Sequence, residues 1–333
     1  MPMNLLVATR DRLLVVEAGR GEVRDAEVPI RSTSDLRPTC LAADPLASGR
    51  AWCGTEADGM WRSDEGGRSW RGVGLEAEEV TAVAASPVEA GVVWVGTEPS
   101  ALWRSTDAGG SWERCEGLDE LPSSSEWSFP PRPETHHVRW IACHPRQAGR
   151  LWLAIEAGAL VTTPDGGRSW RDRVPGGPYD THELAIHPDR PEVLRIAAGD
   201  GYYESFDGGA TWASPEDGLE VGYLRSVAID PGDPGVVVVS AASHAHAAYQ
   251  AGRSDGRLYR REGDGRWERV RDGWPEPPAT IAPLLAAGRE PGELWAADER
   301  GVHRSGDGGR HWERVAAFEP TPPWLRGLAL IDG

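Results

Sequence analysis

Apolar residues in this sequence come in short runs, separated by clusters of Gly, Pro, Asp and Ser. Such runs predict β-strands and turns, and no segment has the apolar spacing of an amphipathic helix. One apolar strand recurs seven times, at residues 38–45, 80–87, 138–145, 181–188, 224–231, 281–288 and 325–332. After each of the first six copies, two further strands, a short motif and a fourth strand follow in the same order.

The short motif has the form S/T-x-D-x-G-x-x-W. Complete copies run over 105–112, 163–170, 205–212 and 305–312. A fifth copy, 63–70, carries Glu65 in place of the Asp, and a degenerate sixth ends at Trp267. The terminal tryptophans follow one another at 42 to 58 residues, the spacing expected of a four-stranded propeller blade.

The strand count predicts how the chain closes. The chain contains seven first strands and seven sets of second and third strands, but it begins with a second strand, because the first set is residues 5–16. The two counts match only if the chain is circularly offset, so that the last first strand belongs to the same blade as that set. Residues 325–331 then complete the N-terminal blade, which removes free sheet edges. We therefore predict an all-β protein, a single seven-bladed β-propeller domain spanning residues 1–333, closed by its C-terminal strand.

Composition narrows the possible partners. The chain has 35 Lys and Arg against 52 Asp and Glu, a formal net charge of −17, which repels nucleic acid and anionic membrane surfaces. No apolar stretch is long enough to span a bilayer, and the N-terminus lacks the pattern of a signal peptide. The four cysteines show no metal-ligand or disulfide spacing. We expect a cytoplasmic monomer.

The S/T-x-D-x-G-x-x-W motif resembles the BNR or Asp-box repeat of bacterial sialidases, sortilin-type receptors, xyloglucanases and photosystem II assembly factors. The resemblance covers nearly the whole chain, which is most similar to bacterial proteins labelled sialidase-like or glycosyl-hydrolase-like. It implies a structural turn in which the Asp accepts hydrogen bonds from turn amides and Gly takes a positive φ. None of the box residues is assigned to chemistry.

Candidate functional residues are expected on the face opposite these turns. Because strand direction alternates, the loops after the second and fourth strands share one face. Both long insertions, 116–134 and 240–257, fall in those loops. Polar residues at the loop-side strand ends there predict a binding site, made of Arg139, Arg225, Arg326, Glu56, Glu98, Glu156 and Trp324.

The first functional hypothesis is a binding propeller. Guanidinium groups and aromatic rings at the predicted site suit an anionic or sugar-like ligand. The partner is then a small molecule, a carbohydrate or a protein. Whether the chain is also an enzyme stays open at this point.

The second hypothesis is a glycoside hydrolase. Resemblance to sialidases implies an arginine triad, a Tyr–Glu nucleophile and an acid Asp. Tyr223 with Glu183 would be the nucleophile, and Asp180 would be the acid. This chain departs from sialidase catalytic domains, which have six blades and a different order of arginines. Two carboxyl groups at a suitable separation also permit ordinary glycoside hydrolysis.

The third hypothesis is an enzyme that uses a divalent transition metal. The candidate ligands are imidazoles from three segments, His137, His182, His244 and His246. His244 and His246 share a face if their segment is extended. Asp180 or Glu183 would then act as a further ligand or as a base.

Overall fold

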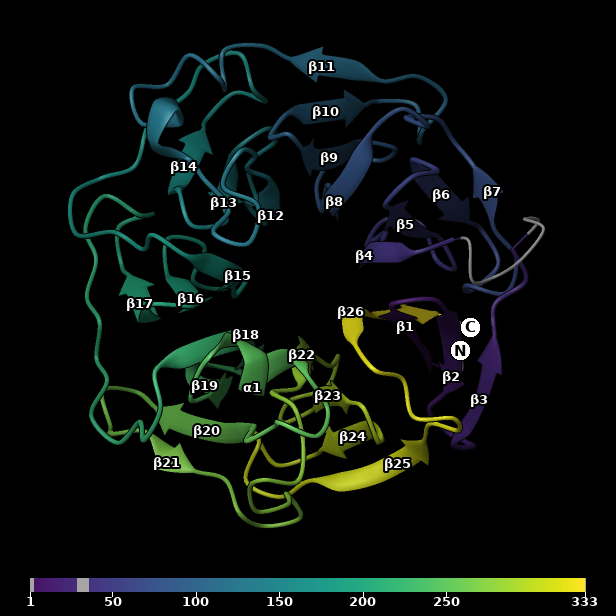
Figure 1. The fold of residues 1–333 in the computed structure, drawn as a ribbon, viewed down its shortest axis with the longest axis vertical. Coiled ribbons are helices and arrows are strands. Elements are labelled where there is room, and N and C mark those ends of the chain that lie inside the picture. The colour runs from purple at the N-terminus through teal and green to yellow at the C-terminus, as the bar shows by residue number, and fades with distance from the viewer. Residues whose placement is uncertain (1–2, 29–35, 333) are drawn as a thin grey trace. The chain divides into compact units, whose positions relative to one another are not determined.

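The computed structural model describes residues 3–28 and 36–332 (Figure 1). The chain falls into two compact units. The first unit contains residues up to 175, residues 179–181 and those from 326 onward; the second contains 176–178 and 182–325. Within the described residues, helix is limited to α1 (Ala245–Tyr249) and a 3-10 turn at Ser124–Glu126. The protein is all-β, as predicted.

The first unit contains four antiparallel sheets built from strands that are consecutive in sequence, apart from β26. Their strands are β26 (Leu325–Asp332), β1 (Met3–Thr9), β2 (Leu13–Glu17) and β3 (Glu22–Asp25); β4 (Pro38–Ala43), β5 (Ala51–Thr55), β6 (Met60–Ser63) and β7 (Arg71–Gly72); β8 (Glu79–Ala85), β9 (Val93–Glu98), β10 (Leu102–Ser105) and β11 (Glu113–Cys115); and β12 (Val138–Cys143), β13 (Leu151–Ile155) and β14 (Ala159–Thr163). The order β26–β1–β2–β3 confirms that the C-terminal strand completes the N-terminal sheet.

The second unit contains three further sheets. Their strands are β15 (Thr181–Ile186), β16 (Leu194–Ala198) and β17 (Gly201–Ser205); β18 (Tyr223–Asp230), β19 (Asp233–Ala242), β20 (Arg257–Glu262) and β21 (Glu268–Arg269); and β22 (Leu284–Ala287), β23 (Leu294–Asp298), β24 (Gly301–Ser305) and β25 (Glu313–Ala317). In the β12 and β15 sheets the fourth strand is reduced to single bridges, Thr162 to Arg171 and Glu204 to Ala213. With the first four, these sheets are the blades of a seven-bladed β-propeller.

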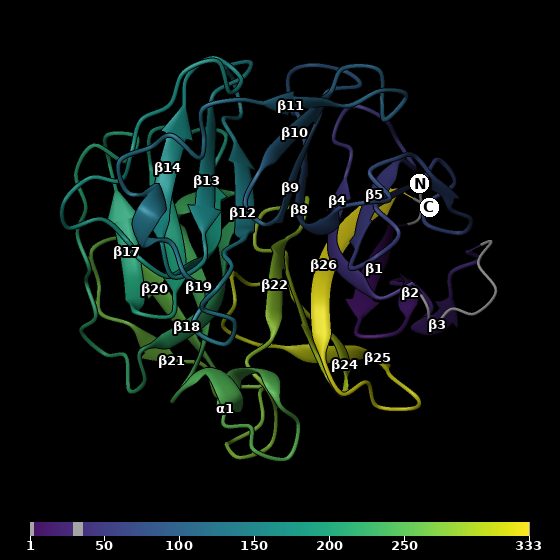
Figure 2. The same cartoon turned by 45° about the horizontal axis from the view of Figure 1, so that its top comes forward.

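Strand β22 starts three residues later than the sequence pattern predicts. Pro283 has no N–H for the sheet ladder, and the amide of Ala282 donates to the carbonyl of Ala248 in α1 at 3.1 Å. Gly256 N–H likewise donates to the carbonyl of Thr280 at 2.7 Å. The insertion between β19 and β20 thus takes the hydrogen bonds that would have extended β22 (Figure 2).

The S/T-x-D-x-G-x-x-W motifs form the turns that the sequence predicts. In the first complete copy, Asp107 accepts hydrogen bonds from the amide of Ser111 at 2.9 Å and from its hydroxyl at 2.8 Å. Ser105 Oγ accepts from the amide of Gly109, whose φ is 84°. The Asp–amide bond recurs at Asp165, Asp207 and Asp307. These aspartates are therefore engaged in shaping the turns.

Tryptophan–arginine pairs stiffen several sheets across their second and third strands. Directly paired residues place a guanidinium 5.1 to 5.9 Å from an indole centroid, in Trp52–Arg62, Trp94–Arg104 and Trp295–Arg304. In the β15 sheet the equivalent pair is Arg195 and Glu204, and Arg261 of β20 also contacts Glu204. A buried ion triad thus replaces the cation–π pair there and joins two sheets of the second unit.

Glycine on the second strand allows neighbouring sheets of the first unit to approach closely. A Cβ added at Gly96 would lie 2.5 Å from Val138 of the next sheet, and one at Gly54 would lie 2.4 Å from Val80. Each valine is fully buried. The same glycine–valine contact therefore recurs between successive pairs of sheets.

We predict that Gly96→Ala lowers the free energy of unfolding by about 1–3 kcal/mol, since overpacking forces backbone or side-chain shifts. Urea unfolding measures it. Gly72→Ala is the matched control, because a Cβ at Gly72 has no atom within 4 Å, and its effect should stay within about 0.5 kcal/mol. Equal effects for the two variants would contradict the packing argument.

The motif turns predict a pH dependence. Hydrogen bonds from Ser111 and from Thr211 lower the pKa of Asp107 and of Asp207 to about 2. A depressed pKa stabilises the fold above the unfolded value near 3.9, and this contribution is lost as pH falls from about 4 to about 2. Carboxyl carbon-13 titration measures both values. In Ser111→Ala the pKa of Asp107 should rise while that of Asp207 stays near 2.

Candidate functional site

A β-bulge interrupts the first strand of four sheets at its loop-side end. The pairing of the first strand with the second skips one residue in each case, and the skipped residues are Thr39, Thr81, Arg139 and Arg225. A bulge re-aims the side chain of the extra residue. Two of the four, Arg139 and Arg225, are residues that the sequence predicts to bind ligand.

Bulge side chains bind the neighbouring sheet. Thr39 Oγ1 donates to the carbonyl of Val80 at 2.5 Å, and Thr81 Oγ1 donates to the carbonyl of Val138 at 2.7 Å. At the same position of β15, His182 Nδ1 lies 2.6 Å from the carbonyl of Leu224. The polar residue at this position therefore joins sheets in both units.

Arg225 is the most deeply buried of the arginines predicted to bind ligand. It is 2% exposed, and its guanidinium donates to the carbonyls of Ala282 at 2.6 Å and Leu325 at 2.5 Å. A longer bond reaches Ala248, and the group lies 4.5 Å from the ring centroid of Tyr249. Arg225 thus links three segments of the second unit through main-chain acceptors.

Glu56 directly follows β5 and contacts two arginines. Its carboxylate lies 3.1 Å from Arg37 and 2.6 Å from Arg326, the latter on β26. Burial opposes ionisation, but the guanidinium groups outweigh it and lower the pKa of Glu56. The predicted ligand-binding residues Glu56 and Arg326 are therefore brought together as an ion pair.

Glu98 ends β9, and its side chain is 5% exposed. Arg132, from the 116–134 insertion, lies 2.6 Å from Glu98 Oε2, and His137 Nδ1 lies 3.5 Å from the same oxygen. Burial and then the nearby carboxylate of Glu79 raise the pKa of Glu98. This carboxylate is thus the most desolvated of the three predicted glutamates.

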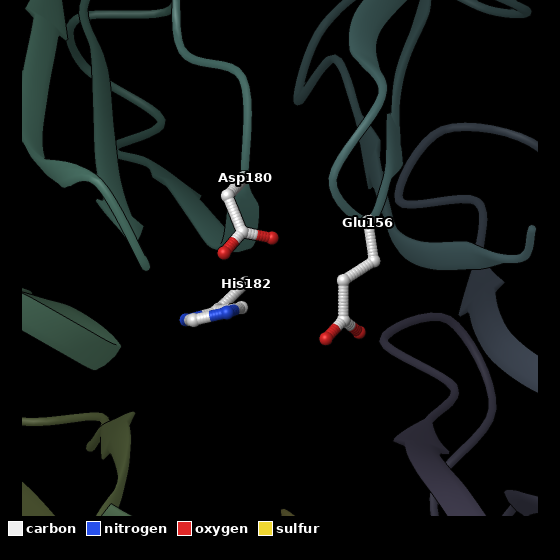
Figure 3. A group of neighbouring side chains, drawn as sticks. All are labelled: Glu156, Asp180 and His182. Carbon is white, nitrogen blue, oxygen red and sulfur yellow. The ribbon is translucent and has the colours of Figure 1, made fainter. Parts of the chain in front are cut away.

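Glu156 follows β13, where His137 Nε2 lies 2.8 Å and Arg139 Nε 3.4 Å from its Oε2. Asp180 accepts a hydrogen bond from the amide of Ala157 at 3.0 Å. Carboxylate oxygens of Glu156 and Asp180 lie within 4.8 Å of one another (Figure 3). The first unit therefore presents a carboxylate pair flanked by an imidazole and a guanidinium.

The loop that carries this carboxylate pair is fixed by its backbone. Ala157 has a φ of 49°, a left-handed conformation that costs energy for a residue with a Cβ. The next amide, Gly158 N–H, bonds to the carbonyl of Tyr179 at 3.1 Å, and Arg173 donates to the carbonyl of Gly158. Glu156 and Asp180 are thereby held by residues on both sides of the pair.

The proposed Tyr–Glu nucleophile pair belongs to the second unit. The Tyr223 hydroxyl lies 3.3 Å from His182 Nε2, and Glu183 accepts a hydrogen bond from Ser226 Oγ. His182 is 1% exposed. These bonds join β15 to β18 and give His182, Tyr223 and Glu183 each a partner in the neighbouring sheet.

The segment that carries His244 and His246 is not an extended strand, so the condition for the two imidazoles to share a face is not met. His246 lies within α1, and His244 caps that helix by accepting a hydrogen bond from the amide of Ala247. Small residues that pack against β18 and β19 favour a helical turn there. Within the described part of the second unit, His182, His244 and His246 do not form a group of three whose ligand atoms all lie within 4.8 Å of one another.

The predicted site residue Trp324 and the insertion residue Trp127 differ in exposure. Trp324 is 37% exposed, as a ligand-stacking residue requires, whereas Trp127 of the 116–134 insertion is 5% exposed and belongs to the core. Arg132 is not among the residues that the sequence predicts for the site, because it comes from an insertion and no repeat position predicts it. The signal that would have found it is the acid pair Glu79 and Glu98, which needs a basic partner.

No helix of the described chain is long and apolar enough to cross a membrane. No protein-family model matches the sequence, and no curated protein does. Solved structures, however, share the fold at low sequence identity. They show the fold alone.

Three of these structures illustrate the likeness. The Niastella koreensis GH74 enzyme has a TM-score of 0.73 at 13% identity over 93% of this chain. The GH74 xyloglucanase of Xanthomonas campestris has a TM-score of 0.67 at 15% identity over 98%. YCF48 bound to D1 peptide has a TM-score of 0.60 at 17% identity over 94% of this chain and 85% of its own. This chain covers 51% and 52% of the two GH74 chains.

The geometry of Arg225 predicts a stability effect. Arg225→Met leaves buried carbonyls without a donor and should lower the free energy of unfolding by at least about 2 kcal/mol. Arg326→Met, which removes a partly exposed ion pair, should cost less than about 1 kcal/mol. Urea unfolding compares the two. An Arg225→Met chain as stable as the wild type would show that its carbonyl contacts are dispensable.

Proposed function

We propose that this chain is a binding propeller whose site is the acidic edge of the first unit. The acidic edge is Glu56, Glu98, Glu156 and Asp180 with the basic side chains that contact them. Repetition carries the proposal: the second strands of three successive sheets each lead into a glutamate held by two basic groups. Binding sites, more than ordinary surfaces, collect charged groups that are both fixed and partly desolvated.

The state of these charges supports binding. Glu98 has lost most of its contact with water, and the side chains of Glu56 and Glu156 are 24% and 16% exposed. Since their neighbours already hold them in place, a ligand that contacts them immobilises few side chains on binding. The site is thus organised before its partner arrives.

The fold comparisons favour a peptide or protein partner. YCF48, which resembles this chain over most of both lengths, was solved with a bound D1 peptide. The GH74 enzymes resemble it over about half of their own length. A likeness that spans most of both chains is the better guide to how an isolated propeller acts, as an analogy of fold.

Glycoside hydrolysis is the second candidate, and the Glu156–Asp180 pair is the observation that favours it. Retaining glycosidases hold two carboxyl groups about 5–5.5 Å apart, one as acid and base and the other as nucleophile. Oxygens of Glu156 and Asp180 lie within 4.8 Å. A sugar bound across this pair would meet both groups.

Binding is tested with an array of random peptides and a panel of neutral and acidic oligosaccharides. Wild-type chain should bind a subset of the peptides, and Glu156→Gln should weaken that binding at least tenfold. Glu113→Gln, at an exposed position on β11, is the matched control and should bind like the wild type. Equal binding by Glu156→Gln, or no binding by the wild type, would overturn the proposal.

The same oligosaccharides decide the second candidate when new reducing ends are measured. Hydrolysis that falls at least a hundredfold in both Glu156→Gln and Asp180→Asn would establish the carboxylate pair as catalytic, since general acid–base groups contribute about that much. Absence of new reducing ends with wild-type chain removes the hydrolase alternative.

A further inference from the structure

Two acids face each other where strand β8 begins and strand β9 ends. Glu79 and Glu98 are directly paired in the register of the two strands. Like charges in such a pair repel, and the repulsion is strong here because the Glu98 side chain is 5% exposed. The two carboxylates therefore require a cation between or beside them.

The equivalent positions of neighbouring sheets hold a base opposite the acid. Arg37 contacts Glu56 in the β4 sheet, and His137 contacts Glu156 in the β12 sheet. In the β8 sheet this base is replaced by Glu79. The replacement leaves two acids facing each other where the neighbouring sheets hold an ion pair.

Arg132 supplies that positive group. Its Nη2 lies 2.6 Å from Glu98 and 3.6 Å from Glu79, and its guanidinium lies 5.6 Å from the ring centroid of Phe129. Arg132 belongs to the 116–134 insertion and not to the sheet. The side chain is 46% exposed, so one side of the guanidinium faces the carboxylates while much of it remains open to solvent.

The root of this insertion is anchored separately from its tip. Leu118, Leu121 and Trp127 are buried in the core of the first unit, and Ser123 bonds to Asp172 through its amide and hydroxyl. Residues 130–134 are exposed. Arg132 is therefore carried by an exposed tip that lies outside the buried root of the insertion.

A buried atom with no hydrogen bond points to the same place. The His137 side chain is only 9% exposed, yet its Nδ1 atom has no hydrogen-bond partner. This atom lies 3.5 Å from Glu98 Oε2. Phe129 packs edge-on against this imidazole, with ring centroids 4.8 Å apart. Beside the carboxylates of the acid pair thus lie the Nδ1 atom of His137 and the aromatic ring of Phe129.

We propose that the Glu79–Glu98 pair receives the guanidinium group of an arginine in a partner peptide, and that Arg132 is its internal occupant. The inference rests on the proposed binding function and names the partner chemistry of one part of that site. A planar guanidinium suits the site because it bonds carboxylates in a fork and stacks on an aromatic face such as Phe129. An ammonium group lacks both properties.

Titration of Arg132→Ala with L-argininamide, followed by calorimetry, tests this proposal. The variant should bind L-argininamide at least tenfold more tightly than the wild type, in which Arg132 competes. Arg114→Ala is the matched control, because Arg114 is similarly exposed at 40% and pairs with exposed carboxylates of the same unit; it should bind no better than the wild type. Arg132→Gln, which keeps a long polar side chain, carries the same expectation if the alanine variant is unstable.

Two further titrations define the site and the ligand class. Adding Glu98→Gln to Arg132→Ala should abolish the gained binding, and L-lysinamide should bind at least tenfold more weakly than L-argininamide. Equal binding of the two amides, or no gain in Arg132→Ala, overturns the inference. Failure of the peptide array with wild-type chain would end the proposed function without deciding this titration, which uses another ligand and a variant with its internal occupant removed.

Discussion

The hydrogen bond from a bulged first strand to the carbonyl of the next sheet is the interaction on which the other features of each unit depend. Thr39 and Thr81 make it in the first unit, and Arg225 makes its longer equivalent in the second. The bulge frees one side chain from its own sheet and directs it sideways. Because this bond lies at the loop-side end of the strands, it also fixes where the glutamates after the second strands emerge.

The sequence predicts the sheets well because the same order of apolar strands and turn motif recurs in each repeat. Strand order, closure by β26 and the motif turns all follow from the spacing of tryptophans and from apolar alternation. The site is predicted less well, since a polar residue at the second position suits two roles equally. Arg225 is occupied by main-chain carbonyls, whereas Arg326 reaches the carboxylate of Glu56, and no local pattern separates the two.

Insertions limit what repeat logic can predict. The helix at 245–249 forms because Ala247 and Ala248 pack against the sheet beneath them, a tertiary contact that the strand pattern does not contain. Arg132 reaches Glu98 from a residue 34 positions away in sequence. Each insertion supplies a partner to a neighbouring segment: α1 offers a carbonyl to the amide of Ala282, just before β22, and the 116–134 segment gives the acid pair its base.

The overall charge and the local acid pair act at different ranges. A net charge of −17 attracts basic partners over distances of about a Debye length, and so raises the association rate without choosing among them. Choice requires groups at contact distance, where a desolvated carboxylate gains most from a matching donor and loses most without one. Glu98 meets that condition through its burial, and Glu79 raises the cost of leaving it unpaired. A chain that repels anionic surfaces at long range is thus suited to select one basic side chain at short range.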